Sequence, residues 1–493
     1  MKSRLEAAPT LSLGRIPMTY RIVILIGAAL LVPTTGAIAQ DTDEILDFID
    51  GRYESTADMA RTLWEYAEVG YQETKSSALI QAALGADGFA IEAGIAGMPT
   101  AFIATYGSGG PLIGIMAEFD ALPGINQDAL SSRVPIEGKS AGHACGHNLF
   151  GAGSTGAAIA IKHWLEETGT PGTIRLFGTP AEEGGSGKVY IVRDGWFDDV
   201  DIVLHWHAGD RNSAAASTTL ANRSAKFRFK GVSAHAAGAP DRARSALDGV
   251  EAFDYMTNLM REHVPQETRI HYVITAGGNA PNVVPDFAEV FYYVRHPEAE
   301  MVKEIWKRIE AAAKGAAQGT GTQVEWEIIH GSHPVLINET LSRMMDEKLH
   351  MVGGVSYTAH EQAFAEEIYA TLNQPELTLG SQEEIQPFKI GLGYHSTDVG
   401  DVSMTVPTVG LRTATWVPGT AAHSWQSTAA SGMTIGYKGA QVAAKTLTLA
   451  AIELFENAEL RAAATAEFQE RRGADFVYEA LLGNRPPALD YRN

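Results

Sequence analysis

The order of strand-like and helix-like segments along the chain is the feature that most constrains its fold. The strand-like segments of the first half are residues 100–106, 112–117, 173–178 and 201–205. A helical segment occupies residues 147–164, and the spacing of apolar positions predicts further helices between residues 43 and 84. Strands that alternate with helices predict an α/β layer structure around a largely buried sheet.

A different order interrupts this alternation in the middle of the chain. The segments there alternate as strand, helix, strand, strand, helix and strand, at residues 224–231, 245–263, 269–276, 287–295, 301–317 and 322–329. This is the ferredoxin-like arrangement. Because it begins and ends cleanly, we predict an inserted lid or dimerisation domain at residues 219–332. The larger α/β domain, with a mixed sheet, is expected to combine residues 40–218 and 333–493.

The last third of the chain returns to the rhythm of the larger domain. A strand is expected at residues 407–411 and a single long, Ala-rich closing helix at residues 428–455. The tail from Arg472 contains Gly, Pro and Asn residues, so we expect it to pack loosely as an irregular extension.

The N-terminal region has the features of a secretory signal peptide. Arg21 precedes an apolar run at residues 22–32, and small residues follow at Ala37-Ile38-Ala39. The run is too short to span a bilayer comfortably. We therefore expect residues 1–39 to be a signal peptide region and the mature protein to be periplasmic or secreted. An uncleaved anchor is the alternative.

Charge and cysteine content restrict the partners. The formal charge of −21 argues against a nucleic acid, because binding to phosphates needs basic patches. No membrane association is expected after cleavage of the signal peptide. Cys145 is the sole cysteine and cannot pair within the chain. Its surroundings suggest instead that a metal ion occupies the thiol.

Short segments near the expected strand ends carry the residues that could do chemistry, and strand ends are where α/β folds bind ligands. Asp120 follows a strand and precedes a Pro-Gly turn, although an Asp in this place is commonly only a turn cap. His143, Cys145 and His147 lie within five residues flanked by glycines. Thiolate and imidazole are metal ligands, so this clustering favours a metal site over a buried cysteine with two surface histidines.

Two further segments and one loop complete the set. Glu182 and Glu183 follow a strand and point in different directions, so that one can bind a metal ion while the other faces a water or a substrate. The alternative is an exposed acidic loop. His205 and His207 alternate along a strand and share one side, and His423 lies in a later loop. With no Ser-His-Asp pattern nearby, the chemistry that fits is metal-assisted hydrolysis with a carboxylate as the base.

These segments resemble a known family. The sequences AEFDALPG, GHACGHN, TPAEEGG and HWH, with the later loop histidine, are similar to those of the M20 metallopeptidases. The most similar branch includes aminobenzoyl-glutamate hydrolase, in its B-type subunit, together with aminoacylases and auxin-conjugate hydrolases. The resemblance implies two divalent metal ions held by Cys145, His147, Glu183, His207 and His423. It also implies Glu182 as the general base and Asp120 as a residue that orients a ligand.

The choice of metal and of one histidine stays open at this point. A shell with a cysteine favours Zn²⁺, with Mn²⁺ or Co²⁺ as alternatives. Glu118 stands where the wider family has a histidine ligand, and Ala208 stands where it often has a proline. His205 competes with His207 for the ligand position, and we prefer His207 because the Trp-His pair is where this branch places it.

The resemblance also implies the substrate contacts and the assembly. His235 matches a residue that reaches across a dimer, and Asn282 and Arg295 match positions near a bound carboxylate. The alternatives are that Asn282 caps a turn and that Arg295 pairs with an acid of the lid. We expect a homodimer, with a heterodimer as the alternative.

The expected activity is hydrolysis of the amide bond of an N-acyl or N-aroyl amino acid with a free carboxylate, such as p-aminobenzoyl-glutamate. A dipeptidase or another amide hydrolase of the family is the alternative, and a non-catalytic partner subunit is a further one. An anionic substrate needs a local basic contact in so acidic a chain, and Arg295, Arg244 and Arg223 are candidates.

Overall fold

The computed structural model describes residues 35–492, with side chains from residue 42 onward. The apolar run of the expected signal peptide, residues 22–32, lies outside the described residues. Among the helices described, none is long and apolar enough to cross a membrane. From Glu44 onward the chain forms one compact unit.

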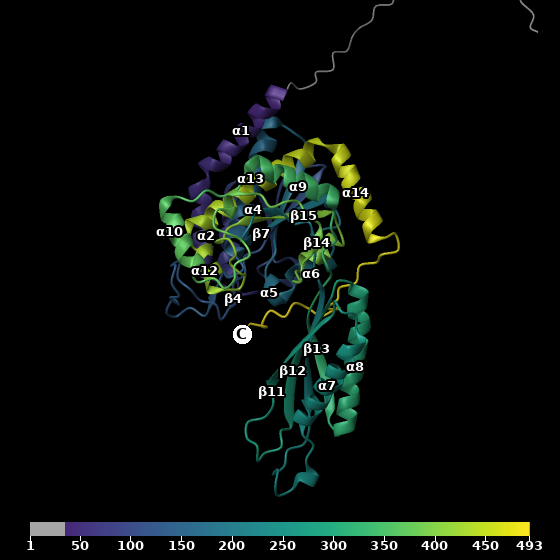
Figure 1. Cartoon of the computed structure of the whole chain (residues 1–493). Helices are drawn as coiled ribbons and strands as arrows, with labels where there is room; N and C mark the ends of the chain where they lie inside the picture. The colour runs from purple at the N-terminus through teal and green to yellow at the C-terminus, as the bar shows by residue number, and fades with distance from the viewer. Residues whose placement is uncertain (1–34, 493) are drawn as a thin grey trace, which may run out of the picture. The chain divides into compact units, whose positions relative to one another are not determined.

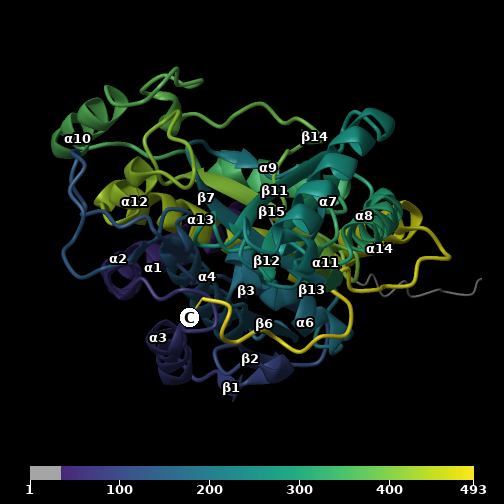
Figure 2. The same ribbon diagram turned by 90° about the horizontal axis from the view of Figure 1, so that it is seen from below.

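A seven-stranded sheet forms the centre of the larger domain (Figure 2). Its strands, in spatial order, are β1 (Ala90–Ala93), β2 (Phe102–Ser108), β6 (Gly172–Gly178), β3 (Leu112–Ala117), β7 (Ile202–Gly209), β15 (Thr408–Ala414) and β8 (Ser213–Ala214). Strands β6, β3, β7 and β15 run parallel, whereas β1, β2 and β8 pair antiparallel with their neighbours. The mixed sheet with its helices confirms the predicted α/β class.

Helices pack on this sheet and on one another. Those of eleven residues or more are α1 (Thr35–Gly51), α2 (Tyr53–Tyr66), α3 (Thr74–Ala86), α4 (His147–Thr168), α9 (Glu339–Val352), α10 (Ala359–Tyr369), α13 (Thr434–Glu456) and α14 (Ala458–Arg472). The short ones are α5 (Glu182–Gly185), α6 (Gly187–Arg193), α11 (Val399–Ser403) and α12 (Trp425–Ser431). Helices α4 and α13 contact each other and strands β3 and β7. Small residues such as Ala440 and Ala444 are fully buried there and let the two helices approach closely.

The closing helix differs from the expectation of one continuous element. It is divided into α12 and α13, with Gly432 between them. A Cβ atom at Gly432 would lie 2.6 Å from the ring of Trp64 in α2. The break therefore depends on a contact with a distant helix, which local periodicity does not reveal.

A second, fully antiparallel sheet accounts for the middle of the chain (Figure 1, teal). Its order is β11 (Arg269–Ala276), β12 (Phe287–His296), β10 (Ala221–Lys230) and β13 (Gln323–Ser332). Helices α7 (Ala246–Met260) and α8 (Ala299–Thr320) contact this sheet and have a core of their own with it, which includes Phe227, Tyr292 and Trp306. The element order is the one expected from the sequence, and we refer to this part as the lid.

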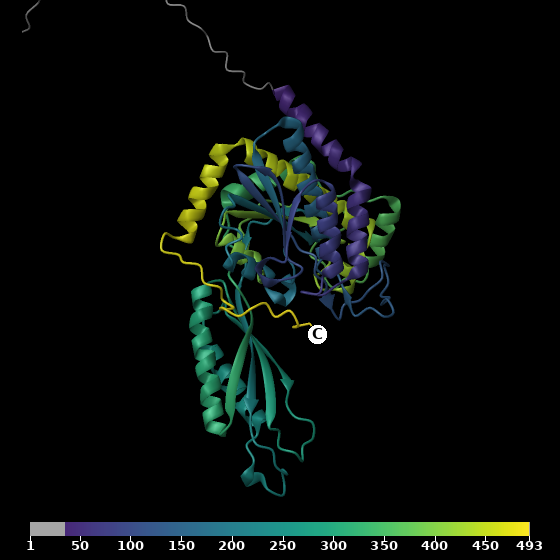
Figure 3. The same cartoon turned by 180° about the vertical axis from the view of Figure 1, so that it is seen from behind.

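Short two-residue strands complete the main chain: β4 (Leu122–Pro123) pairs with β5 (Ala141–Gly142), and β9 (Ser217–Thr218) pairs with β14 (Gly391–Leu392). The expectation of a loosely packed tail is wrong. Leu481 is buried in the core of the lid and Leu482 in the core of the larger domain, each only 2% exposed. Arg485 donates to the carbonyl of Ile328 in β13. Figure 3 shows this segment, in yellow, leaving α14 and passing the end of the lid sheet.

Candidate metal centre

The carboxyl ends of the four parallel strands meet at one edge of the large sheet, and the site lies there. Glu118 and Asp120 follow β3, and Glu182 and Glu183 follow β6. His207 lies near the end of β7, which extends past the expected end at residue 205. Residues more than sixty positions apart in sequence thus meet because their strands are neighbours.

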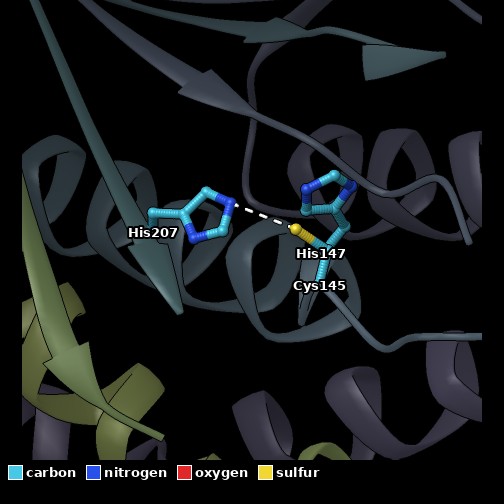
Figure 4. A group of neighbouring side chains, drawn as sticks. All are labelled: Cys145, His147 and His207. Carbon is cyan, nitrogen blue, oxygen red and sulfur yellow. Dashed lines mark hydrogen bonds between the residues drawn. The ribbon is translucent and has the colours of Figure 1, made fainter. Parts of the chain in front are cut away.

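The Cys145–His147 loop enters the site through a glycine. Gly146 has a φ of +75°, and a Cβ atom there would lie 2.4 Å from the Cβ of Ala208. Only glycine fits this turn, which ends where α4 begins at His147. Figure 4 shows Cys145, His147 and His207 facing one another, with the Cys145 Sγ atom 3.5 Å from His207 Nε2.

The donor atoms form three overlapping groups, in each of which all atoms lie within 4.8 Å of one another. The groups are Cys145, His147 and His207; Cys145, Glu183 and His423; and Glu118, His147 and Glu182. Cys145 belongs to two of them, so its sulfur lies between the first and second groups. All five residues expected as ligands, together with Glu182, are thus brought together by the structure.

Buried atoms without hydrogen-bond partners test whether a cation fits. Asp120 Oδ1 accepts from His147 Nδ1 at 2.8 Å, which leaves His147 Nε2 facing Glu118 Oε2 at 3.0 Å. His147 Nε2 and Glu118 Oε2 are both buried and have no hydrogen-bond partner. The same is true of Glu183 Oε1. Glu183 Oε1 lies 3.1 Å from His423 Nε2. A proton on the imidazole or a metal ion can satisfy these facing atoms. The donor set of one thiol, three imidazoles and a carboxylate, with all atoms of each group within 4.8 Å of one another, fits divalent metal ions.

Electrostatics at the site follow from burial and from the many acids. Burial and then Glu183 raise the pKa of the Cys145 thiol far above its usual range. Burial lowers the pKa of His207 to about 3, so this imidazole is neutral and can ligate a metal. Burial, then Glu118 and Glu183, raise the pKa of Glu182 well above its usual range. Glu182 is therefore a carboxylate with a strong tendency to take up a proton.

The turn that carries Glu182 and Glu183 is strained, and hydrogen bonds from a distant part of the chain hold it. Ala181 and Ser186 have φ values of +56° and +60°, which L-residues with a side chain seldom adopt. Glu73 Oε1 accepts from the amide of Ala181 at 2.8 Å, and its other oxygen accepts from Thr100 at 3.0 Å. Glu73 is fully buried. Sequence reasoning gave Glu73 no role.

Further bonds fix where Glu183 and His423 point. The Glu183 amide donates to Asp120 Oδ2 at 2.9 Å, so that Asp120 orients both His147 and Glu183. The His423 amide donates to the carbonyl of Ala144 at 3.0 Å, which attaches the later loop to the Cys145 segment.

Lys188 is a second residue that sequence reasoning missed. Its Nζ atom lies 2.6 Å from Glu118 Oε1 and 2.7 Å from Asp398 Oδ1, and all three side chains are buried. The ammonium group compensates two carboxylates at the floor of the site. A single lysine within a short apolar helix offers no pattern from which this could be inferred.

Two histidines of the motifs lie outside the donor groups. His143 Nε2 is bonded to the carbonyl of Leu63 at 3.0 Å, and its Nδ1 accepts from the amide of Asn148, so it ties α2 to the start of α4. His205 packs against Gly410, where a Cβ atom would lie 2.3 Å from the ring. His207, rather than His205, therefore faces Cys145.

The lid residues expected to touch substrate are divided between the two ends of its sheet. Arg295 pairs with Asn222 at the end of the sheet where β10 begins. His235 lies beyond the other end of the ten-residue β10 and bridges with Val283, next to Asn282. A strand of this length spans ~33 Å. Within one chain, His235 and Asn282 are thus not brought to the cluster, whereas Arg295 lies on the side that adjoins it.

The three arginines proposed as basic contacts have different surroundings. Among the described residues Arg295 forms no ion pair with an acid, so the alternative that it pairs with an acid of the lid is not met, and its Nε atom is buried without a hydrogen-bond partner. Arg244 donates to the carbonyl of Ala243 and Arg223 lies over the ring of Trp306. A further arginine, Arg412 in β15, pairs with His207 in the sheet register and was not singled out from the sequence.

Known proteins share both the sequence and the fold that build this site. Residues 114–384 match the model of the peptidase family M20/M25/M40. The chain belongs to this family. This M20 chain is 37% identical to a p-aminobenzoyl-glutamate hydrolase subunit of Escherichia coli (strain K12) over 87% of its own length and 95% of that protein. It is 28% identical to the Xaa-Arg dipeptidase of Mus musculus over 85% and 90% of the two chains.

A solved structure shares the fold of the M20 chain. The dinuclear metal-binding M20 peptidase of Bacillus subtilis superposes with a TM-score of 0.55 at 18% identity, and the match covers 83% of this chain and 99% of that one. Family membership and the curated relatives identify the M20 chain as a hydrolase of the amidohydrolase and peptidase type.

Proposed function

We propose that this M20 enzyme hydrolyses the amide bond between an acyl or aroyl group and an amino acid that has a free carboxylate, as in p-aminobenzoyl-glutamate. The observation that carries the proposal is the convergence of Cys145, His147, Glu183, His207 and His423, with Glu182 beside them. The similarity to p-aminobenzoyl-glutamate hydrolase supports the aroyl-amino acid class. A dipeptidase is the second candidate, favoured by the similarity to Xaa-Arg dipeptidase.

The donor groups suggest which residues would hold two divalent ions. Cys145, His147 and His207 would hold one, and Cys145, Glu183 and His423 the other. A shell of this composition favours Zn²⁺, with Mn²⁺ or Co²⁺ as alternatives. Such ions, when bound, polarise a scissile carbonyl and lower the pKa of a bound water.

Glu182 is the group placed to move the proton. Its carboxylate lies within 4.8 Å of donor atoms of His147 and Glu118, and it is not a member of the two groups that share Cys145. We infer that Glu182 takes the proton of the attacking water and delivers it to the nitrogen of the leaving amine. Its raised pKa supports this role, since a base must hold the proton between the two transfers.

We also propose a homodimer formed through the lid. Apolar side chains are exposed on α7 and on the side of β11, an edge strand, that faces the helices of the lid: Tyr255 at 66%, Leu259 at 55%, Ile274 at 41% and Met256 at 40%. Exposed apolar patches of this kind mark protein interfaces. A second copy would cover this patch and could bring its His235 and Asn282 to the site, from which these residues are remote within one chain.

The N-terminal sequence supports export of the enzyme. We propose that residues 1–39 direct the chain to the periplasm or the exterior. N-terminal sequencing of the mature protein tests this, with a start near Gln40 as the expected result and retention of Arg21 as the contradicting one.

A substrate screen tests the activity. Purified enzyme supplied with Zn²⁺ or Mn²⁺ is incubated with N-aroyl amino acids, N-acyl amino acids and dipeptides, and the released amine is measured. The expected result is turnover of N-aroyl amino acids. Turnover of dipeptides alone would favour the dipeptidase, and no turnover of any amide would reject the proposal.

A further inference from the structure

Arg412 lies beside the metal centre and forms no ion pair with an acid among the described residues. In the parallel register of β15 and β7 it is opposite His207, so both side chains leave the same face of the sheet. Its guanidinium donates to His395 Nε2 at 3.3 Å. Across residues 35–492, no carboxylate forms an ion pair with Arg412, and the neighbouring Asp210 is bonded to Arg211 at 2.8 Å.

His395 connects Arg412 with the part of the lid sheet that carries Arg295. The carbonyl of His395 accepts from the amide of Leu220 at 2.9 Å, directly before β10 begins. Two residues further on, Asn222 pairs across the sheet with Arg295. Burial and then the charges of Arg412 and Arg295 lower the pKa of His395 to about 4, so its ring is neutral and accepts the Arg412 hydrogen bond.

Arg295 likewise forms no ion pair with an acid among the described residues. Its Nε atom is buried without a hydrogen-bond partner, and its guanidinium lies over the ring of Tyr293 at 5.4 Å. Burial lowers the pKa of both Arg295 and Arg412. Two desolvated guanidinium groups that form no ion pair among the described residues are unfavourable, and in a chain with a formal charge of −21 the lack of such a partner is unexpected.

The chemistry that satisfies both groups is a pair of carboxylates. We propose that Arg412, held by His395, binds the side-chain carboxylate of the substrate, while Arg295 binds its α-carboxylate. The amine portion of the substrate is then a dicarboxylic amino acid such as glutamate or aspartate. This rests on the amide hydrolysis proposed above and adds to it the residue that selects the side chain. Planar guanidinium groups bind carboxylates in a bidentate manner, which suits this selection.

If the site selects by charge, kcat/KM should depend on the charge of the amino-acid side chain in the substrate. An N-aroyl glutamate satisfies both arginines, an N-aroyl glutamine satisfies one, and an N-aroyl arginine adds a cation to two others. We expect kcat/KM to fall in that order. A hydrogen bond between charged groups favours the glutamate over the glutamine by about 10- to 100-fold.

The variant Arg412→Gln tests the proposal, with Arg412→Lys as a variant that keeps the charge. We expect Arg412→Gln to lower kcat/KM for the glutamate substrate by about 10- to 100-fold and to change the value for the glutamine substrate by less than about 3-fold. Arg343→Gln, an exposed arginine paired with Glu339, is the matched control and should leave both values unchanged. Metal content and melting temperature of all variants report whether the centre and the fold are intact.

Two readouts separate this proposal from the proposed activity. An equal loss for both substrates in Arg412→Gln, with metal retained, would overturn the role of Arg412 and leave the amide hydrolysis standing. Calorimetric binding of free glutamate and of alanine to the metal-loaded protein needs no turnover. Glutamate should bind more tightly than alanine to the wild type, and this difference should disappear in Arg412→Gln. Equal binding of the two amino acids by the wild type would also overturn the proposal.

Discussion

Glu182 and Glu183 are neighbours in sequence, yet their carboxylates belong to different groups of side chains. Glu183 joins Cys145 and His423, whereas Glu182 joins Glu118 and His147. The difference arises because the main chain turns sharply between Ala181 and Ser186. A ligand and a proton carrier can thus lie side by side without competing for one position.

The Glu182→Gln variant tests whether Glu182 carries the proton while Glu183 serves as a metal ligand. The amide keeps the shape of the side chain but cannot accept the proton, so kcat should fall by about 10²- to 10⁴-fold while metal content stays that of the wild type. Glu166→Gln, which changes an exposed glutamate paired with Lys162, is the matched control. If kcat for Glu182→Gln stayed within about tenfold of the wild type, another group would have to be the base.

Sequence reasoning at the residue scale succeeds where coordinating residues are clustered. Cys145 and His147 lie two positions apart, and the glutamate pair and His207 occupy short motifs at strand ends. Glu73, Lys188 and Arg412 could not be found in this way. Lys188 and Arg412 are single charged residues in largely apolar stretches, whereas Glu73 stands among polar residues of a loop. The partners of all three lie tens to hundreds of positions away.

At the scale of elements, the glutamate turn is shaped by a segment from a different part of the chain. Tyr71 donates to the carbonyl of Gly185 at 2.7 Å, and Glu73 accepts from Ala181. Both come from the loop between α2 and α3. Since the turn has unfavourable φ values, it depends on these bonds to keep its conformation.

Glu73→Ala should therefore release the turn. Loss of the buried acceptor leaves the Ala181 amide unsatisfied and is expected to lower the free energy of unfolding by about 1–3 kcal/mol. Metal occupancy should fall too, because Glu183 is no longer held in place. Denaturant unfolding and metal analysis measure the two effects, and Glu73→Gln, which keeps an acceptor oxygen, should be milder in both. Equal effects of the two variants would contradict this account.

A strand with a continuously apolar sequence was easier to predict than the ends of elements that depend on distant contacts. The segment at residues 112–117 is continuously apolar and forms β3 with those same bounds. By contrast, β7 continues four residues beyond its expected end, because it pairs with β15 along that stretch. The break at Gly432 likewise depends on Trp64. Bounds set by distant contacts leave no trace in the local pattern.

At the scale of the whole molecule, the order of elements was sufficient to predict a mixed α/β sheet and a ferredoxin-like block. The integration of the tail was not predictable, because its segment from residue 473 lacks regular periodicity. It is held by single anchors such as Leu481, Leu482 and Arg485 instead.

The distance between the two ends of the lid leads to a test of the proposed dimer. Glu182→Ala and His235→Ala are each expected to be nearly inactive, yet coexpression of the two should restore about one quarter of wild-type activity. Half of the dimers are then mixed, and each of these contains one complete site of two. Coexpression of Glu182→Ala with Cys145→Ala, whose changes lie in the same domain, should restore nothing. Failure of the first pair to complement would argue against a site shared between subunits.

The central claim is that five side chains from distant parts of the sequence surround a pair of cations. Anomalous diffraction from crystals of Zn²⁺-loaded protein, collected on both sides of the zinc absorption edge, tests it most directly. The account predicts two peaks, one among Cys145, His147 and His207 and the other among Cys145, Glu183 and His423. The absence of a peak between these side chains, or strong peaks only elsewhere, would contradict it.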